Sequence, residues 1–333
     1  MIDAPESAFV TGGSGFIGGR LIERLTASGT SVRALARSDE SAAAVEALGA
    51  EAARGDLSDR DAISAGARDC STAFHLAAHL GTWGRREDFI RDNVAGTEKA
   101  LAACREAGVA RFVHCSTEAA LIAGEPLHMV DETAPVRPDS KALYCSTKAL
   151  AERAVRVAGG GGFETVVLRP RFVWGRGDTT LLPSMTAMVE QGKFAWIGGG
   201  RQLTDTTHVD NVVEGLLAAA ARGRPGEAYF VTDGDRVVFR EFVSALLETQ
   251  GVEPPTRSVP AWLAGGAAAA GEAAWKLLPL GGSPPLTRFA VWVSSQECTI
   301  EISKARSELA YEPPRSRADG LAELRDAAGA AAR

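Results

Sequence analysis

The segment TGGSGFIG, residues 11–18, joins a short apolar stretch at 7–10 to a stretch with apolar residues at helical spacing, Phe16–Ser28. Its glycines fit the spacings GxxGxxG and GxGxxG, formed by Gly12, Gly13, Gly15 and Gly18. In such a turn the early glycines permit the tight bend, Gly15 lets backbone approach a pyrophosphate, and Gly18 lets the helix pack close to the strand. The helix start at Phe16 and Ile17 offers free N–H groups to anionic oxygens. The segment predicts a dinucleotide site and an α/β fold around it.

The composition narrows the class of protein. Of 333 residues, 45% are hydrophobic and 23% charged, which excludes disorder of the whole chain. Lys and Arg number 36 against 42 Asp and Glu, so 36 − 42 = −6, and this mild acidity argues against a nucleic-acid partner. Glycine is in excess, with 36 residues or about 11% against roughly 7% on average, and aromatic residues are only 6%. The glycines therefore need specific uses, of which the turn at 11–18 is the first.

Neither targeting nor metal binding is indicated. The start, MIDAPES, has no basic segment and no long apolar run, so we expect no signal peptide. Five cysteines are scattered without a CxxC pair, which indicates reduced thiols in a cytoplasmic protein and no metal site.

One apolar segment, Ala261–Gly282, reaches the length of about 20 residues that spans a bilayer. Glu272 and Lys276 lie inside it, four residues apart, where a helix would pair them and where lipid would make both charges costly. We therefore expect no membrane span but an amphipathic helix beside an apolar pocket. Peripheral membrane contact stays open as an alternative.

Strands and helices alternate through the first half of the chain. Further strands are expected at 31–36, 51–54, 72–76, 111–115 and 165–168, and helices at 41–48, 59–67, 88–107 and 142–158. Such alternation predicts a doubly wound parallel sheet with right-handed crossovers. After Pro170 the pattern loosens and becomes rich in Pro and Gly. The expected fold is α/β: a Rossmann-type NAD(P)-binding domain at 1–170 with return elements at 206–234, a smaller C-terminal substrate-binding domain at 171–205 and 235–315, and a terminal helix or tail at 316–333.

The end of the second strand indicates the nucleotide. An acidic residue there usually holds a ribose 2′-hydroxyl, but this strand ends in Ala36, followed by Arg37 and Ser38. A guanidinium suits a 2′-phosphate, so the sequence favours NADP, and NAD remains the alternative if Arg37 only stacks on adenine. Asp56 as an acceptor and Leu57 as an apolar wall, after the third strand, are placed to meet the adenine.

A tyrosine and a lysine supply candidate acid–base chemistry. Tyr144 and Lys148 are four residues apart at a helix start, so they share one face. A neighbouring ammonium is expected to lower the pKa of the phenol and so make it a usable proton donor or acceptor. Their position after five strands, with the hydroxyl pair Ser116 and Thr117 at the end of the fifth, favours a catalytic role.

Six motifs in order carry a resemblance to a known family. They are TGGSGFIG, DNVAGT (92–97), HCST (114–117), YCSTK (144–148), LRPRFVWGRGD (168–178) and HVDN (208–211). The chain resembles the extended short-chain dehydrogenases/reductases along nearly its whole length. Segments 79–83, 174–178, 229–234 and 285–289 are similar to the 3β-hydroxysteroid dehydrogenase and sterol-4-carboxylate dehydrogenase branch and to 2-alkyl-3-oxoalkanoate reductases.

The resemblance implies roles for particular residues. Tyr144 would be the general acid in reduction and the base in oxidation. Lys148 would hold the nicotinamide ribose, and Thr117 would hydrogen-bond the substrate oxygen, with Ser116 as the fallback. The family also implies that Ala77, Ala78 and Pro170 border the cofactor, that Asn93 assists a proton relay, and that helices 88–107 and 142–158 form a homodimer. Ala36 departs from the Asp of NAD-using members of the steroid branch.

Several other residues have a simpler interpretation. We expect His75 and His208 to be structural, with His208 and the Asp-Asn pair after it at an interdomain joint. Cys115 and Cys145 lack a positioned base, so neither is expected to be a nucleophile. For Arg169, Arg171 and Arg176 we favour packing salt bridges over binding of a substrate anion. The tryptophans at 83, 174, 196, 262, 275 and 292 either fill the core or line an apolar pocket.

These features together predict an oxidoreductase that moves hydride between nicotinamide C4 and a secondary alcohol or ketone. The expected substrate is large and apolar, either a 3-hydroxy or 3-oxo steroid or a long-chain 3-oxo acid. One alternative is a nucleotide-sugar epimerase or dehydratase, against which the apolar segment 261–280 argues. A second is a non-catalytic NADP-sensing protein, against which an intact Thr117, Tyr144 and Lys148 argues.

Overall fold

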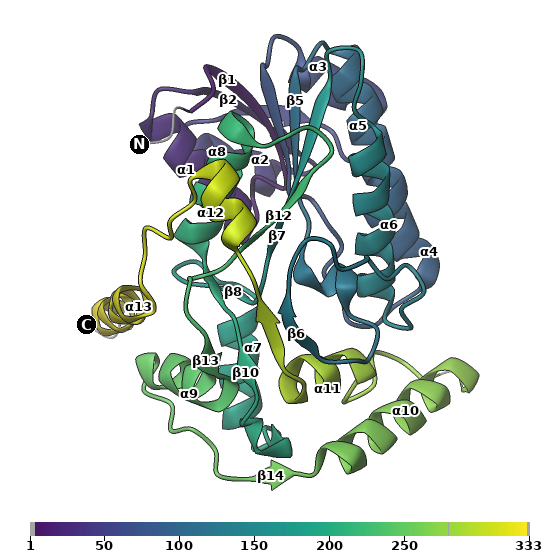
Figure 1. The fold of residues 1–333 in the computed structure, drawn as a ribbon, viewed down its shortest axis with the longest axis vertical. Coiled ribbons are helices and arrows are strands. Elements are labelled where there is room, and N and C mark those ends of the chain that lie inside the picture. Colours follow the sequence, from purple (N-terminus) through teal and green to yellow (C-terminus); the bar gives the residue numbers. More distant parts are fainter. Residues whose placement is uncertain (1–3, 279, 332–333) are drawn as a thin grey trace.

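One large parallel sheet forms the centre of the molecule (Figure 1), and the computed structural model describes residues 4–278 and 280–331. Residues 1–3 and 332–333, on which the expectations about a signal peptide and the terminal tail partly rest, lie outside the described residues. The strand order is β12-β7-β5-β4-β1-β2-β3, and every pair is parallel. The strands are β1 (Ser7–Thr11), β2 (Ser31–Ala36), β3 (Glu51–Arg54), β4 (Thr72–His75), β5 (Arg111–Cys115), β7 (Glu164–Pro170) and β12 (Ala228–Val231). The order reverses between β1 and β4, and ligands bind doubly wound sheets at that point.

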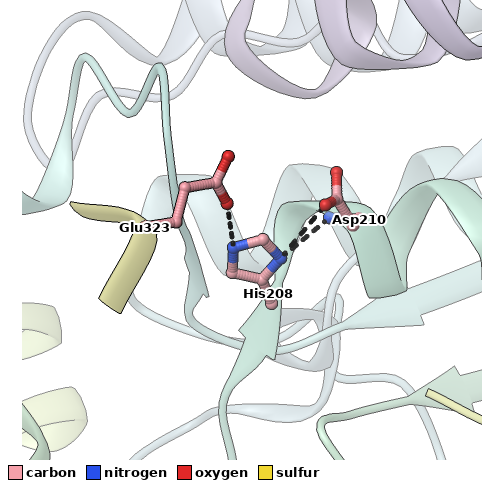
Figure 2. A group of neighbouring side chains, drawn as sticks. All are labelled: His208, Asp210 and Glu323. Atoms are coloured by element: carbon pink, nitrogen blue, oxygen red, sulfur yellow. Dashed lines mark hydrogen bonds and ion pairs between the residues drawn. The ribbon is translucent and has the colours of Figure 1, made fainter. Parts of the chain in front are cut away.

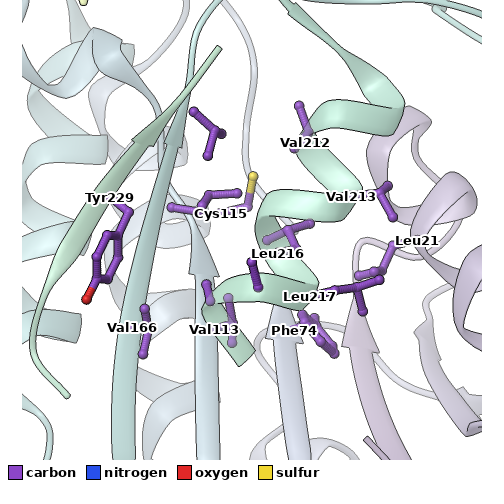
Figure 3. Close-up of a cluster of buried hydrophobic side chains, with 14 of the residues drawn as sticks. Leu21, Phe74, Val113, Cys115, Val166, Val212, Val213, Leu216, Leu217 and Tyr229 are labelled. Atoms are coloured by element: carbon purple, nitrogen blue, oxygen red, sulfur yellow. The ribbon is translucent and has the colours of Figure 1, made fainter. Parts of the chain in front are cut away.

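Helices cover both faces of this sheet, which confirms the expected fold class. The flanking helices are α1 (Phe16–Ala27), α2 (Asp39–Glu46), α3 (Arg60–Ala67), α5 (Gly96–Glu106), α6 (Leu143–Val157) and α8 (Val209–Arg222). On one face α3, α5 and α6 pack side by side, and on the other α1 packs against α8. Figure 3 shows α8 over the sheet, with Val212 and Leu216 of the helix and Val113 and Val166 of the strands in one fully buried cluster. Each such side chain contributes about 1.5–3 kcal/mol through burial.

The segment expected as one helix at 88–107 is divided into three parts. It consists of α4 (Arg86–Phe89), a π-helical turn η1 (Ile90–Ala95) and α5. In the wider turn the Asn93 amide accepts a hydrogen bond from the His79 backbone N–H at 2.6 Å and donates to Thr147 Oγ1 at 3.1 Å. π-turns often mark functional positions in helices. The expectation of a regular helix was wrong because this buried amide takes hydrogen-bond partners that lie outside the helix.

A second, smaller sheet is built mostly from the C-terminal half. Its order is β13-β10-β15-β6, with β13 (Val237–Val238), β10 (Leu203–Thr204), β15 (Cys298–Ile300) and β6 (Leu127–Val130). Two further pairs join β8 (Val173–Trp174) to β11 (Thr207–His208) and β9 (Trp196–Ile197) to β14 (Ser258–Val259). The associated helices are α7 (Leu181–Glu190), α9 (Phe239–Thr249), α10 (Ala261–Leu277), α11 (Arg288–Ser295) and α12 (Ser303–Leu309). Strand β6 was not expected, and the division into domains at Pro170 stays a prediction.

Helix α10 does not contain the ion pair expected between Glu272 and Lys276. Glu272 instead pairs with Arg288 of α11 at 2.6 Å, and the Lys276 ammonium lies 5.9 Å from the centre of the Trp83 ring. Both charges therefore connect α10 to neighbouring segments. Within the described residues, no helix combines the length and apolar character needed to cross a membrane.

The terminal helix α13 (Arg317–Ala331) packs against α9 through Leu321 and Leu324, which are buried with Trp174 and Phe242. A close approach at Gly320 makes this docking sterically tight. A Cβ atom there would lie 2.6 Å from Trp174 Cη2 and 2.7 Å from His208 Cδ2.

Figure 2 shows the polar side of this joint, where Glu323 and Asp210 flank the His208 ring. His208 Nδ1 accepts the Asp210 backbone N–H at 3.2 Å, and its Nε2 lies 3.9 Å from a Glu323 oxygen. These three side chains could in principle hold a metal ion. The Asp210 carboxylate, however, is already paired with Arg20 at 2.6 Å and Arg315 at 3.1 Å. We therefore interpret the group as the expected joint.

Replacing Gly320 by alanine should loosen this joint. The added methyl group overlaps two rings, so we expect the free energy of unfolding to fall by about 1–3 kcal/mol. Gly329→Ala is the matched control, because a Cβ there meets no atom within 4 Å and alanine favours the same helix. Thermal unfolding should show a lower midpoint for the first variant and an equal or higher one for the second. Equal midpoints for both variants would contradict the steric account.

Candidate active site

A large cavity of about 1900 Å³ lies at the carboxyl edge of the main sheet. One end is lined by the turn at 12–18 and by residues that follow β2, β3 and β4. The other end is lined by α7, α10 and α11. Thr117, Tyr144, Lys148 and Pro170 also line this cavity. The expected nucleotide and catalytic residues thus share one space.

The turn at 12–18 has the geometry of a phosphate cradle. Gly12 has φ of +73°, and its carbonyl accepts the Gly15 N–H at 3.1 Å. A Cβ on Gly18 would lie 2.1 Å from that carbonyl oxygen, and one on Gly12 would lie 2.7 Å from the Ala77 nitrogen. No side chain caps the first turn of α1, and no acidic residue stands in it. The backbone N–H groups at the helix start are therefore left for an anion, and the turn fits the pyrophosphate of a dinucleotide.

The residues expected around the adenosine lie further along the same cavity. Arg37 is exposed and lines it, as do Asp56, Leu57, Ala77 and Ala78. Asp56 Oδ1 accepts two hydrogen bonds from Ser58, at 2.7 and 2.6 Å, and these bonds lower the pKa of the carboxyl group, which suits an acceptor.

Ser38 has a different local role from the one expected. Its hydroxyl accepts the Ser41 N–H at 3.2 Å, and its own N–H donates to Ser41 Oγ at 2.9 Å, so the two form a capping box at the start of α2. The residue that lines the cavity here is Ser41 and not Ser38. The sequence alone could not show which of the two serines lines the cavity, because Ser38 and Ser41 are one helical turn apart.

Tyr144 is half-buried between the Thr117 region and Phe289, whose ring centre lies 5.9 Å from its own. Burial raises the pKa of Tyr144 well above its ordinary value, and the Glu118 carboxylate adds to this shift. The Thr117 hydroxyl acts in the opposite sense. In the protein alone, Tyr144 is therefore a protonated group, as a general acid in ketone reduction must be.

Lys148 does not lower the Tyr144 pKa in the way that the spacing of four residues suggested. Its Nζ donates to the Cys115 carbonyl at 2.8 Å and lies 3.4 Å from His114 Nε2, and the side chain is buried. Burial lowers the pKa of Lys148, while Cys115 and Glu152 oppose that shift. Tyr144 and Lys148 do share one face of the helix, as their spacing predicts. The ammonium group of Lys148, however, contacts strand β5.

The two hydroxyls at the end of β5 each meet a buried carboxylate. Ser116 Oγ donates to Glu152 Oε2 at 2.7 Å, and Thr117 Oγ1 donates to Glu118 Oε2 at 2.7 Å. Arg169 pairs with Glu152, and Arg171 pairs with Glu118 at 2.7 Å. The expected packing salt bridges of these two arginines are present. Glu118 lines the cavity, and the sequence interpretation missed it because its partners become apparent only in the fold.

His75, Cys115 and Cys145, which lie near the site, have structural roles. His75 Nδ1 lies 2.7 Å from Thr11 Oγ1 and its Nε2 lies 3.0 Å from Thr97 Oγ1, and burial lowers its pKa to about 3. It is therefore a neutral hydrogen-bonding link. Burial raises the pKa of Cys115 to about 11 and that of Cys145 further, so neither is a thiolate at neutral pH.

The second half of the cavity is apolar but not built from tryptophan. Trp196 lines it, while Trp174 is buried in the core and Trp262 is 79% exposed. The wall instead consists of aliphatic side chains and phenylalanines, among them Phe172, Leu181, Met185, Met188, Phe194, Leu263, Leu286, Phe289 and Val293. The wall of the cavity is thus apolar, as expected, but aliphatic residues and phenylalanines form most of it and the tryptophans do not.

A phosphate turn on a doubly wound sheet, with Thr117, Tyr144 and Lys148 beside it, defines an oxidoreductase of the extended short-chain dehydrogenase/reductase class. A model of the 3-beta hydroxysteroid dehydrogenase/isomerase family matches residues 9–261, and the chain belongs to this family. Enzymes of the class use a nicotinamide cofactor, and the cradle described above fits one.

Known relatives include reductases of apolar ketones. The chain is 46% identical over 319 residues, 96% of each chain, to the 4-hydroxy-2-methyl-3-oxo-4-farnesyl-3,4-dihydroquinoline-1-oxide ketoreductase of Stigmatella aurantiaca. It is 34% identical over 335 residues, 96% of this chain and 99% of the relative, to the 2-alkyl-3-oxoalkanoate reductase of Stenotrophomonas maltophilia (strain K279a). The solved structure of MoeE5 in complex with UDP-glucose and NAD is 25% identical, with a TM-score of 0.74 over 98% of this chain and 100% of that chain.

Replacing Gly18 by alanine should disrupt the cradle, because the new methyl group would overlap the Gly12 carbonyl. We expect affinity for NADPH to fall by at least about tenfold, since the helix can no longer approach the strand. Gly19→Ala is the matched control in the same helix, as its nearest contact, Leu48 Cδ1, is at an ordinary 3.5 Å. Titration of NADPH fluorescence measures both affinities. Similar affinities for the two variants would argue against the cradle.

Proposed function

We propose that the protein is an NADP(H)-dependent ketoreductase for a large apolar substrate. It would transfer hydride between nicotinamide C4 and a secondary alcohol or ketone. The observation that carries this proposal is the placement of Thr117, Tyr144 and Lys148 in one cavity, between the phosphate turn and an apolar wall.

The substrate class follows from the size and lining of that wall. The part of the cavity beyond Tyr144 is lined by α7, α10 and α11 and presents mainly hydrocarbon surface. Such a surface suits a prenyl or alkyl chain or a sterol nucleus. Polar side chains also line this part of the cavity, among them Thr180, Ser184, Lys193 and Arg257. The two relatives named for a farnesylated quinoline oxide and for 2-alkyl-3-oxoalkanoates support a ketone that carries a long apolar group. A 3-oxo steroid and a long-chain 3-oxo acid are the two candidates.

The cofactor and the protein supply different parts of the reaction. When bound, the nicotinamide cofactor supplies or accepts the hydride. Tyr144 donates its phenolic proton to the ketone oxygen in reduction and accepts it from the alcohol in oxidation. Lys148 is placed to hold the ribose, and Thr117 to hydrogen-bond the reacting oxygen. The apolar side chains around them exclude water.

The preference for NADP rests on Ala36 and Arg37. Ala36 at the end of β2 offers no carboxylate to a 2′-hydroxyl, and the exposed Arg37 guanidinium lines the cavity. The NAD held by MoeE5 keeps NAD as the alternative cofactor.

We also propose a cellular location, a homodimer and a peripheral contact for the protein. Five free cysteines, all buried, agree with reduced thiols and support a cytoplasmic location. A homodimer through the segments 88–107 and 142–158 is the family expectation. Trp262 and Leu277, 79% and 83% exposed on α10, support peripheral contact with a membrane or another apolar surface.

A nucleotide-sugar epimerase or dehydratase is the second candidate function. The same fold holds UDP-glucose and NAD in MoeE5. Cofactor that stays bound through purification and turnover of a nucleotide sugar would favour it. A non-catalytic NADP-sensing protein is the third candidate, and binding without turnover of any ketone would favour that. A spectrophotometric panel of 3-oxo steroids, 2-alkyl-3-oxoalkanoates and UDP-sugars separates all three.

Tyr144→Phe should abolish ketone reduction, because the phenylalanine ring has no proton to give. We expect turnover to fall by at least about a hundredfold. Affinity for NADPH should stay nearly intact, which serves as the control for folding. Turnover close to that of the unaltered protein would refute the assignment of the general acid.

Arg37→Ala should weaken NADPH binding much more than NADH binding, because the lost guanidinium pairs with the 2′-phosphate. A loss of about 1.5–3 kcal/mol, or roughly ten- to a hundredfold in affinity, is expected for NADPH. Parallel titrations with the two cofactors measure the difference. An equal loss for both would show that Arg37 contacts the adenine and not the phosphate.

A further inference from the structure

Glu118 is a buried carboxylate in the wall of the reaction cavity. It opens the short 3-10 helix η2 (Glu118–Leu121) directly after Thr117. The Thr117 hydroxyl donates to Glu118 Oε2 at 2.7 Å and accepts the Ala119 N–H at 3.1 Å. A hydroxyl has one proton and two lone pairs. In the protein alone Glu118 therefore takes the proton of Thr117, and the hydroxyl must turn this proton away from Glu118 to hydrogen-bond a ketone oxygen.

The second half of the chain holds Glu118 in place. Arg171 Nη1 donates to Glu118 Oε1 at 2.7 Å, while its Nε and Nη2 donate to Thr204 Oγ1 at 3.0 and 2.9 Å. Thr204 belongs to β10 of the smaller sheet, and all three side chains are buried. A carboxylate held from two sides in this way cannot turn to follow the substrate.

A parallel arrangement lies on the other side of β5. Ser116 donates to Glu152, and Glu152 is paired with Arg169, in the same order of hydroxyl, carboxylate and guanidinium. Glu152 and Arg169 are fully buried, and neither lines the cavity. The Glu152–Arg169 pair thus lies behind the cavity wall, while Glu118 of the other pair is part of that wall.

We propose that Glu118 is a positioning residue that acts through its charge on Tyr144 and raises the turnover of ketone reduction relative to that of alcohol oxidation when the substrates are saturating. This inference rests on the proposed function. Reduction needs Tyr144 with its proton and oxidation needs the phenolate. A fixed negative charge beside the phenol opposes loss of that proton.

The groups that face Tyr144 support this assignment. Glu118 approaches it from η2, the uncharged ring of Phe289 from α11, and the thiols of Cys115 and Cys145 from β5 and α6. After burial, the Glu118 charge is the largest cause that raises the pKa of Tyr144. The ammonium on the same helix, Lys148, is turned to the Cys115 carbonyl.

Glu118→Gln is the direct test, because it removes the charge and keeps an amide oxygen for the Thr117 proton. A 3-oxo steroid or a 2-alkyl-3-oxoalkanoate, whichever is reduced in the panel, and its alcohol serve as substrates. At one fixed pH and with all substrates saturating, the ratio of the turnover number of oxidation to that of reduction should rise about tenfold for each unit by which the Tyr144 pKa falls. The upper pH limit of reduction should move down by about one unit. The ratio does not depend on how much of the protein is folded.

A second readout needs neither cofactor nor substrate. The chain has three tyrosines, Tyr144, Tyr229 and Tyr311, so a protein labelled with ¹³C at tyrosine Cζ gives three signals. The spectrum of Tyr144→Phe assigns the signal of Tyr144. In Glu118→Gln this signal should begin to titrate at lower pH than in the unaltered protein.

A charge-neutral variant guards against misfolding, since Glu118→Gln leaves Arg171 buried without its partner. Glu118→Gln with Arg171→Met should show the same shift. Glu152→Gln with Arg169→Met is the matched control for loss of a buried ion pair, and it should lower the unfolding temperature similarly without moving the Tyr144 signal. If the Glu118 variants keep the wild-type ratio and titration while Tyr144→Phe is inactive, the inference fails and the proposed function stands. If Tyr144→Phe stays active, the proposed function fails first.

Discussion

The close approach of helix α1 to the Gly12 carbonyl is the constraint on which the rest of the site depends. At Gly18 the two backbones are so near that no side chain fits between them. This contact sets the direction of α1 and leaves its first N–H groups facing the end of β4, where Ala77 also leaves no room for a side chain at Gly12. The position of an anion, and hence of a dinucleotide along the sheet edge, follows from these backbone contacts.

The catalytic groups occupy the same edge for a topological reason. Parallel strands end together, so Thr117 after β5 and Pro170 at the end of β7 meet without any long-range pairing of their own. Tyr144 and Lys148 lie in the first turns of α6, which packs beside α5 on one face of the sheet. The smaller sheet then closes the space from the other side with apolar helices. Binding, proton transfer and exclusion of water are therefore properties of one cavity built from two halves of the chain.

Local features of this arrangement could be predicted from sequence, and contacts between distant segments could not. The glycine turn, the strand–helix alternation and the shared face of Tyr144 and Lys148 depend on residues a few positions apart. The capping role of Ser38, the π-turn around Asn93 and the Arg171–Glu118 pair depend on what the folded chain brings near them. The sequence left the tryptophans between core and cavity, and only the fold shows that Trp174 fills the core while Trp196 lines the cavity.

The neutral histidine behind the phosphate turn has a consequence for acid tolerance. His75 links Thr11 of β1 to Thr97 of α5, and its pKa in the folded protein is about 3. The unfolded chain takes up a proton at this residue near pH 6.5, whereas the folded chain does not until about pH 3. The stabilisation that neutral His75 gives to the folded state is therefore present in full above pH 6.5. It is lost at about 1.4 kcal/mol per pH unit as the solution is acidified between these values. The link that supports the cofactor cradle thus makes this enzyme acid-labile.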